Sequence, residues 1–225
     1  MKPHSYLDLT REMFVDLLDV SWQWYGRANQ KDGRAKYPSM AWDLLIHAGA
    51  SKVHPHFHLY LDRRRHQGHF GQLTSAAASY HRQTGRDYWE DTVQLHLALG
   101  LGLAVPGGHI LVPLTSRKDN EFLVVYRGSG LAGLGHIIHQ LVATYTTELS
   151  VYCWNMGVAW PVMHDGDGPT LLRIGARGDC SSIRSDVSSL ELYTFYSLNV
   201  DPYQTLASLK KHVQGNNTHS SHPGK

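Results

Sequence analysis

The chain has 225 residues, of which 42% are hydrophobic and 10% aromatic, a composition typical of a folded globular protein. The formal charge is only +2, from 21 Lys and Arg against 19 Asp and Glu, which excludes the strong overall field of a nucleic-acid-binding or membrane-surface protein. The most apolar run, residues 95–105, is far too short to cross a membrane.

Cysteine usage and the N-terminal residues bear on the cellular compartment. Residues 1–6 contain no apolar signal core, which argues against secretion. Cys153 and Cys180 lie far apart in the sequence and do not form a metal-binding pair. We therefore expect a cytoplasmic protein in a reducing environment, with no nucleic acid and no membrane among its partners.

The N-terminal part of the chain predicts a mixed α/β unit. Residues 9–28 carry apolar side chains at helical spacing behind Asp8 as N-cap, and predict an amphipathic helix. The apolar positions are Leu9, Met13, Leu17, Val20 and Trp24. A polar loop over 31–38 is followed by a short strand over 41–46 and by a turn of small residues at 48–51.

The rest of the chain predicts strands, a helix, more strands and a final helix. Residues 62–71 are polar and basic, as in a linker. The elements predicted beyond it are a helix over 75–82, strands over 109–114 and 121–126, a helix over 131–149, strands over 151–162 and 170–176, and a helix that begins at Asp201 and Pro202. This order predicts an α+β fold, a mostly antiparallel sheet with flanking helices.

Three histidines dominate the segment that follows the small-residue turn. His54, His56 and His58 alternate with apolar residues, and residues 52–61 are predicted to form a strand. Successive side chains of a strand point to opposite faces, so the three imidazoles are expected to share one face. Imidazole can act as a nucleophile, a proton carrier or a metal ligand near neutral pH.

Two chemistries fit such a row of histidines. A His-x-His pair can chelate zinc or iron together with a further ligand, so zinc is one candidate although no cofactor is certain. Alternatively, a neutral imidazole can attack the phosphorus of a nucleotide, provided that a hydrogen-bond acceptor holds its other nitrogen. His56 is central in the row, and the turn at Gly49 and Ser51 could bring N–H groups and a hydroxyl to a phosphate.

At these residues the sequence resembles the histidine triad superfamily. Residues 54–60, His-Pro-His-Phe-His-Leu-Tyr, fit its alternating pattern, and residues 49–51 fit the Gly-x-Ser that precedes it. The segment Ala-Gly-Ala-Ser-x-x-His-Pro-His is similar to sequences of the galactose-1-phosphate uridylyltransferase branch, which also contains phosphorylases. The resemblance implies a histidine-triad-like fold, His56 as nucleophile, supporting roles for His54 and His58, and a phosphate contact for Ser51.

The resemblance extends more loosely over about residues 40–205. Segments 177–179, 185–186, 191–193 and 201–203 resemble the closing part of transferase-like proteins. His47 stands where the superfamily often has Asn and is a candidate ligand contact. At the position of His58 the uridylyltransferase branch commonly has Gln. A histidine at this position is the residue found in triad hydrolases.

The resemblance implies a division of the chain and a function. We expect a partial triad unit over 1–65, a second uridylyltransferase-like unit over 70–215 and a disordered polar tail over 216–225. The expected function is nucleotidyl transfer, phosphorolysis or hydrolysis of a nucleoside diphosphate or nucleotide sugar, with a homodimer left open. Because only residues 1–48 precede the Gly-x-Ser turn, the alternative is a nucleotide-binding or interaction module that lacks catalysis.

Overall fold

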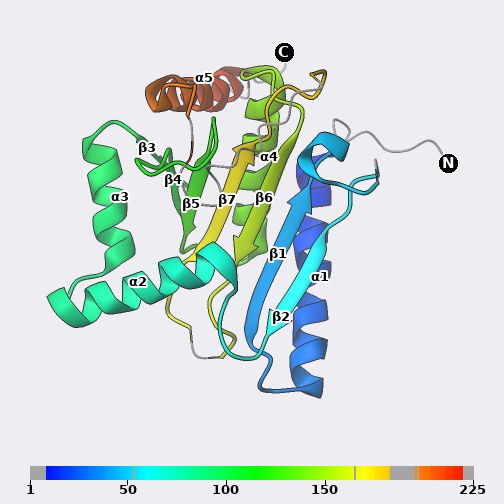
Figure 1. Ribbon diagram of the computed structural model, residues 1–225, viewed down its shortest axis with the longest axis vertical. Coiled ribbons are helices and arrows are strands. Elements are labelled where there is room, and N and C mark those ends of the chain that lie inside the picture. Colours follow the sequence, from blue (N-terminus) through cyan, green and yellow to red (C-terminus); the bar gives the residue numbers. More distant parts are fainter. Residues whose placement is uncertain (1–8, 53, 165, 183–195, 197, 220–225) are drawn as a thin grey trace, which may run out of the picture.

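A computed structural model describes residues 9–52, 54–164, 166–182, 196 and 198–219, and builds them around a seven-stranded sheet (Figure 1). The strand order is β2-β1-β6-β7-β5-β4-β3, and every neighbouring pair is antiparallel. The strands are β1 Tyr37–Asp43, β2 His58–Asp62, β3 Gly102–Val105, β4 Gly108–Leu111, β5 Phe122–Tyr126, β6 Trp154–Ala159 and β7 Thr170–Ala176. This confirms the predicted α+β class with an antiparallel sheet.

Helices cover the sheet unequally on its two faces. They are α1 Arg11–Lys31, α2 Gly68–Thr84, α3 Tyr88–Ala98, α4 Leu131–Thr147 and α5 Pro202–His219. Helices α1 and α4 lie behind the sheet, α2 crosses in front of it, and α5 lies across its upper end (Figure 1). Within the described residues, no helix is both long and apolar enough to span a membrane.

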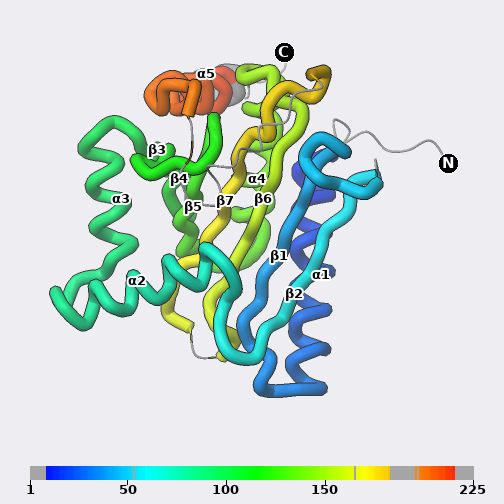
Figure 2. The backbone as a smooth tube through the Cα atoms, viewed as in Figure 1, coloured from blue at the N-terminus to red at the C-terminus, as the bar shows by residue number. Residues whose placement is uncertain are grey.

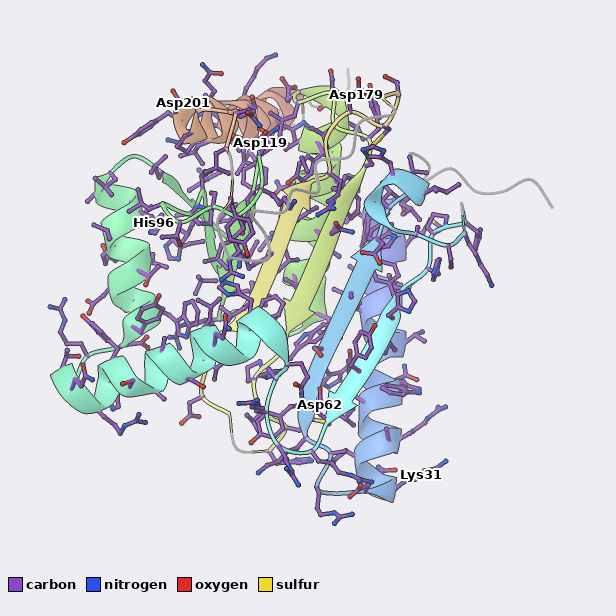
Figure 3. The ribbon with its side chains drawn as sticks, in the orientation of Figure 1. Lys31, Asp62, His96, Asp119, Asp179 and Asp201 are labelled. Carbon is purple, nitrogen blue, oxygen red and sulfur yellow. A yellow bond between two sulfur atoms is a disulfide. The ribbon has the colours of Figure 1, made fainter. Side chains whose placement is uncertain are left out.

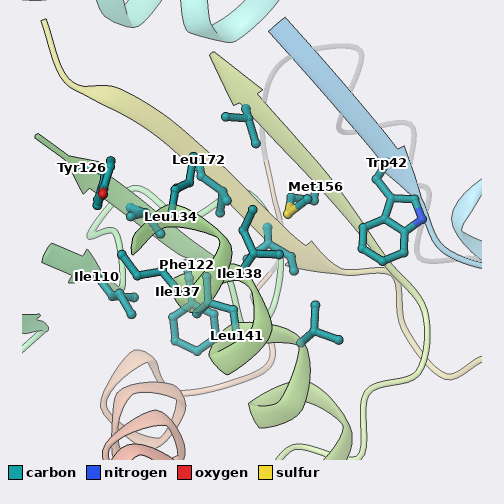
Figure 4. Close-up of a cluster of buried hydrophobic side chains, with 14 of the residues drawn as sticks. Trp42, Ile110, Phe122, Tyr126, Leu134, Ile137, Ile138, Leu141, Met156 and Leu172 are labelled. Atoms are coloured by element: carbon teal, nitrogen blue, oxygen red, sulfur yellow. The ribbon is translucent and has the colours of Figure 1, made fainter. Parts of the chain in front are cut away.

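The main core lies between the sheet and helices α1 and α4. Leu134, Ile138 and Leu141 of α4 are at most 1% exposed and belong to one buried cluster with strand residues such as Trp42 and Leu172 (Figure 4). Strand β5 is buried along its whole length, as expected for a strand near the middle of a sheet. The opposite face of β1, β6 and β7 therefore takes no part in this core.

Helix α1 confirms the predicted helix but buries a different face. Its N-cap is Thr10, whose side chain accepts a hydrogen bond from the backbone N–H of Met13, and the proposed cap Asp8 lies outside the described residues. The buried positions are Phe14, Leu18, Ser21, Tyr25 and Asn29. The predicted stripe lies one residue away, so that Val20 is 64% exposed.

The predicted histidine strand over 52–61 is too long. Pairing between β1 and β2 begins at Ala41 opposite His58, so His54 and His56 lie ahead of the strand and not within it. Pro55 between them has no N–H to donate to a ladder, which disfavours strand pairing at this point. Strand β1 is also shifted from its predicted position at 41–46 to Tyr37–Asp43.

Other elements agree more closely with expectation. Strand β7 has the predicted bounds, while α2 begins at Gly68 inside the predicted linker, and α3 and β3 were not predicted. Strand β1 joins β6 within the same sheet, and the division of the chain into two units stays a prediction. Of the predicted tail, residues 216–219 belong to α5, and 220–225 lie outside the described part of the chain.

Candidate functional site

A row of side chains crosses the sheet on the face away from α1 and α4. The registers place His58 opposite Ala41, Ala41 opposite Gly157, and Gly157 opposite Arg173. Residues directly opposite each other in an antiparallel pair point to the same face. Because Ala41 and Gly157 are small, the row runs from a histidine to an arginine across a shallow floor.

The imidazole of His56 is held by the backbone just before it. Its Nδ1 atom lies 3.0 Å from the carbonyl oxygen of His54, and a carbonyl oxygen can only accept a hydrogen bond. We therefore assign the proton of neutral His56 to Nδ1, which leaves Nε2 with a free lone pair. The rings of His56 and His58 lie 5.0 Å apart at their centroids, while the side chain of His54 is exposed.

The turn ahead of the histidines is anchored to the sheet by Asn155. The Asn155 side-chain amide donates hydrogen bonds to the carbonyl oxygen of Ala48, at 2.7 Å, and to the Asp43 carboxylate. Gly49 follows with φ of +96°, a conformation that L side chains rarely adopt. Gly49 and Ser51 are exposed on this turn, and no hydrogen bond joins Ser51 to the histidines in the described part of the chain.

A second loop meets this turn at the same end of the sheet. Strands β1 and β7 both pair antiparallel with β6, so their last residues lie at one end, as the tube shows (Figure 2). Asp179, in the loop after β7, lies at this upper end, whereas Asp62 lies at the lower end (Figure 3). Hydrogen bonds from the Ser181 side chain and backbone, and then the charge of His47, lower the pKa of Asp179.

His47 lies in the short 3-10 helix Ile46–Ala48, near enough to the loop after β7 for its charge to act on Asp179. Its Nε2 atom is buried and has no hydrogen-bond partner among the described residues.

The loop after β7 is fixed by a disulfide between Cys153 and Cys180, whose Cα atoms lie 5.9 Å apart. Pairing of these cysteines was not expected from their spacing, and it removes the argument from cysteine usage for a reducing compartment.

A cavity of about 370 Å³ opens beside the row of small residues. Its basic lining consists of His69, Arg117, Lys118, Arg173 and Arg177. The Arg173 guanidinium pairs with the Glu121 carboxylate, which also accepts the backbone N–H groups of Arg117 and Lys118. Burial, followed by repulsion from Arg173 and Arg117, lowers the pKa of His69 to about 4.

Sequence reasoning missed Asn155, Arg173 and the disulfide. Asn155 and Arg173 are polar side chains inside runs of strand-forming residues, and such an interruption was the available signal. Zinc was a candidate cofactor, but among the residues that the structure describes no group of three or more His, Cys, Asp and Glu side chains is placed to hold a metal ion.

Comparison with known proteins gives matches among solved structures alone. No protein-family model and no curated protein sequence matches the chain. A uridylyltransferase structure matches with a TM-score of 0.73 at 14% identity, over 92% of this chain and 70% of that chain. An ADP-glucose phosphorylase from Arabidopsis thaliana, solved with bound ADP-glucose, matches with a TM-score of 0.65 at 14% identity, over 91% and 67% of the two chains.

A third solved structure matches with a lower TM-score. A DUF4931 family protein from Bacillus cereus gives a TM-score of 0.55 at 14% identity, over 94% of this chain and 83% of that chain. At such identities the likeness concerns the fold. The chain therefore has the fold of these uridylyltransferase and ADP-glucose phosphorylase structures, in agreement with the fold expected from the pattern at residues 54–60.

Proposed function

We propose that this protein transfers the nucleotidyl group of a nucleoside diphosphate derivative, such as a nucleotide sugar, through a covalent bond to His56. The observation that carries the proposal is the hydrogen bond from His56 Nδ1 to the carbonyl oxygen of His54. It fixes the tautomer that an attacking imidazole needs, with Nε2 unprotonated. The fold shared with a uridylyltransferase and an ADP-glucose phosphorylase supports the same reading.

The proposed reaction has two balanced steps. In the first step, Nε2 of His56 attacks the α-phosphorus, a P–N bond forms, and the bond from phosphorus to the bridging oxygen breaks. The leaving group departs as a phosphate or sugar phosphate. In the second step, the oxygen of an acceptor (phosphate, sugar phosphate or water) attacks the same phosphorus and releases His56.

Residues around His56 have supporting roles in this proposal. The N–H groups and hydroxyl of the turn at Gly49 and Ser51 contact the non-bridging phosphate oxygens, where charge accumulates. His58, whose ring neighbours that of His56, lies beside the reacting group. Asn155 holds the turn in position through Ala48.

Mass spectrometry of the intact protein tests the proposal. The protein is mixed with a panel of nucleoside diphosphate sugars that differ in base, and the mass is read at neutral pH. The expected result is one adduct, whose added mass identifies the nucleotide. The adduct is expected to be absent in His56→Ala and present in His109→Ala, which changes a histidine on β4.

An adduct that persists in His56→Ala would overturn the assignment of the nucleophile. The alternative function, a nucleotide-binding or interaction module without catalysis, has a different signature. Calorimetry would then show saturable nucleotide binding while neither adduct nor turnover forms with any member of the panel. That combination would replace the enzymatic proposal.

A further inference from the structure

We propose that the cavity of about 370 Å³ beside the triad is the subsite for the base of the nucleotide, with the rings of Phe70 and Tyr196 as its walls and His69 as a hydrogen-bond acceptor. The inference rests on the proposed function, because it assigns a part of the same substrate. Binding of the base is nevertheless measured without any covalent step. Helix α2, which crosses in front of the sheet, supplies His69 and Phe70 (Figure 1).

The charged side chains that line the cavity have partners within the protein. The Arg173 guanidinium pairs with the Glu121 carboxylate, whose second oxygen accepts backbone N–H groups of the loop at 117–118. The Asp43 carboxylate accepts a hydrogen bond from a side-chain amide of β6. Lys118 and Arg177 also have interaction partners. Because these charges are already engaged, the cavity suits an uncharged polar group of the substrate better than a further charge.

Two aromatic rings line the same space. The guanidinium carbon of Arg117 lies 5.3 Å from the centroid of the Tyr196 ring, and this cation–π contact holds the ring at the wall of the cavity. The Phe70 ring lies directly over the sheet, since a Cβ atom added to Gly157 would lie 2.9 Å from it. A base is a planar group with two apolar faces, and stacking on an aromatic ring stabilises bound bases of any kind. The rings therefore match the shape of a base.

His69 provides a polar group that distinguishes one base from another. Its Nδ1 atom lies 3.4 Å from the side-chain oxygen of Gln72, which can only accept, so we assign the proton to Nδ1 and acceptor character to Nε2. Burial and then the charges of Arg173 and Arg117 lower the pKa of His69 to about 4, so the imidazole is neutral at neutral pH. A neutral Nε2 atom can accept a hydrogen bond from an N–H group of a base.

The sheet places the cavity within reach of the proposed nucleophile. His58, whose ring neighbours that of His56, lies opposite Ala41, which lies opposite Gly157. Neighbouring strands are about 4.8 Å apart, so two steps place the backbone of Gly157 roughly 10 Å from that of His58. A ribose and one further carbon separate the base of a nucleotide from its α-phosphorus. With only small side chains between, a nucleotide bound at His56 can lay its base in the cavity.

Isothermal calorimetry with nucleoside 5′-monophosphates tests the subsite, with ribose 5-phosphate as the ligand that lacks the base. Neither ligand carries a leaving group, so no adduct forms. The preferred monophosphate is expected to bind the wild type about tenfold or more tightly than ribose 5-phosphate, because of base stacking. This affinity ratio is expected to fall to about threefold or less in Phe70→Leu, which removes the ring, and in Ala41→Leu, which fills the floor.

Matched variants control for changes away from the cavity. Tyr203→Leu removes an aromatic ring that is 53% exposed on α5, and is expected to keep the wild-type ratio. His69→Leu is expected to lower the ratio several-fold for the preferred base, whereas His81→Leu, at an exposed position of the same helix, is expected to leave it unchanged. Retained affinity for ribose 5-phosphate shows that each variant is folded.

The outcomes separate this inference from the proposed function. A tenfold ratio that is retained in His56→Ala, with no adduct in the wild type, supports the base subsite and removes the catalytic proposal. A wild-type ratio near one overturns the subsite even where the adduct forms. So does a ratio that Phe70→Leu and Ala41→Leu leave unchanged, or one that Tyr203→Leu lowers as much as Phe70→Leu does.

Discussion

The Nδ1 atom of His56 lies 3.0 Å from the backbone carbonyl oxygen of His54. The tautomer of the proposed nucleophile therefore depends on the main chain of His54 and not on its imidazole. The side chain of His56 is therefore required for the proposed reaction, whereas His54 contributes through its carbonyl oxygen. Substitution of the two side chains tests this difference.

Replacement of the two side chains should have unequal effects. We expect His54→Ala to keep the carbonyl oxygen and to lower the rate of adduct formation by about tenfold or less, in the range of one supporting group. We expect His56→Ala to lower it by roughly three or more orders of magnitude, as loss of a nucleophile does. Single-turnover kinetics with the best nucleotide of the panel measures both. Equal losses in the two variants would show that the side chain of His54 takes part in the chemistry.

Asn155 should control the turn that carries Gly49 and Ser51. Its amide bridges the carbonyl oxygen of Ala48 and the Asp43 carboxylate, so Asn155→Ala leaves both acceptors without this donor. We expect a loss of about 1–3 kcal/mol in the free energy of unfolding and a lower kcat. A double-mutant cycle with Asp43→Ala should give a coupling energy of about 0.5–3 kcal/mol. Strictly additive effects in urea unfolding would contradict the bridge.

The disulfide should stabilise the loop that carries Asp179. Cys153 and Cys180 are 27 residues apart, and closing a loop of this length contributes about 3–4 kcal/mol in the chain-entropy account. We expect dithiothreitol to lower the urea midpoint of the wild type, and Cys180→Ala to start at that lower midpoint. The variant should not respond to the reductant further. An identical midpoint for oxidised and reduced wild type would refute a stabilising bond.

Acid should destabilise the protein through His69, which is partly buried. Burial and the neighbouring Arg173 and Arg117 lower the pKa of His69 to about 4, against an ordinary value of 6.5. Between these values the unfolded chain binds more protons than the folded one, so stability present above pH 6.5 is lost as the pH falls toward 4. We expect His69→Gln to flatten this dependence in unfolding measured from pH 7 to 4. An imidazole NMR titration of His69 with a midpoint near 6.5 would contradict the expectation.

The elements that the sequence predicts correctly are those whose hydrophobic pattern is complete within one short segment. Residues 170–176 form a strand because a mostly apolar run, interrupted by Arg173, suits a strand that is largely covered on both faces, and the apolar stripe of 131–149 gives α4. The triad pattern likewise lies within a few residues, and on it alone His56 is predicted as the nucleophile, a role that stays a prediction. The prediction of each of these features depends on neighbouring residues and not on distant parts of the chain.

The features that were missed depend on the register between distant strands. Arg173 belongs to the row of His58 only because β1 and β6 stand between them in the sheet, and that order is set by packing and not by sequence position. The pairing of Cys153 with Cys180 has the same origin, because spacing alone does not determine connectivity. The histidine strand is shorter than its alternating pattern predicts because Pro55 has no N–H to donate to a strand neighbour.

Helix α1 shows how a local pattern can favour the wrong face. It carries two adjacent apolar stripes, one with Phe14, Leu18 and Tyr25 and one with Met13, Val20 and Trp24. Neighbouring helix positions differ by about 100°, so both stripes satisfy the helical period, and periodicity cannot choose between them. The choice is made by the fit against the sheet and α4, where Phe14 contacts the ring of Trp42.

Two substitutions two residues apart test which stripe is buried. Leu18 is 1% exposed, and we expect Leu18→Ala to lower the free energy of unfolding by about 2–5 kcal/mol through lost contacts and a cavity. Val20 is 64% exposed, and we expect Val20→Ala to change it by less than about 0.5 kcal/mol. Urea unfolding with a common slope compares the two variants directly. The reverse order of effects would mean that α1 is rotated and that the stripe of Val20 faces the core.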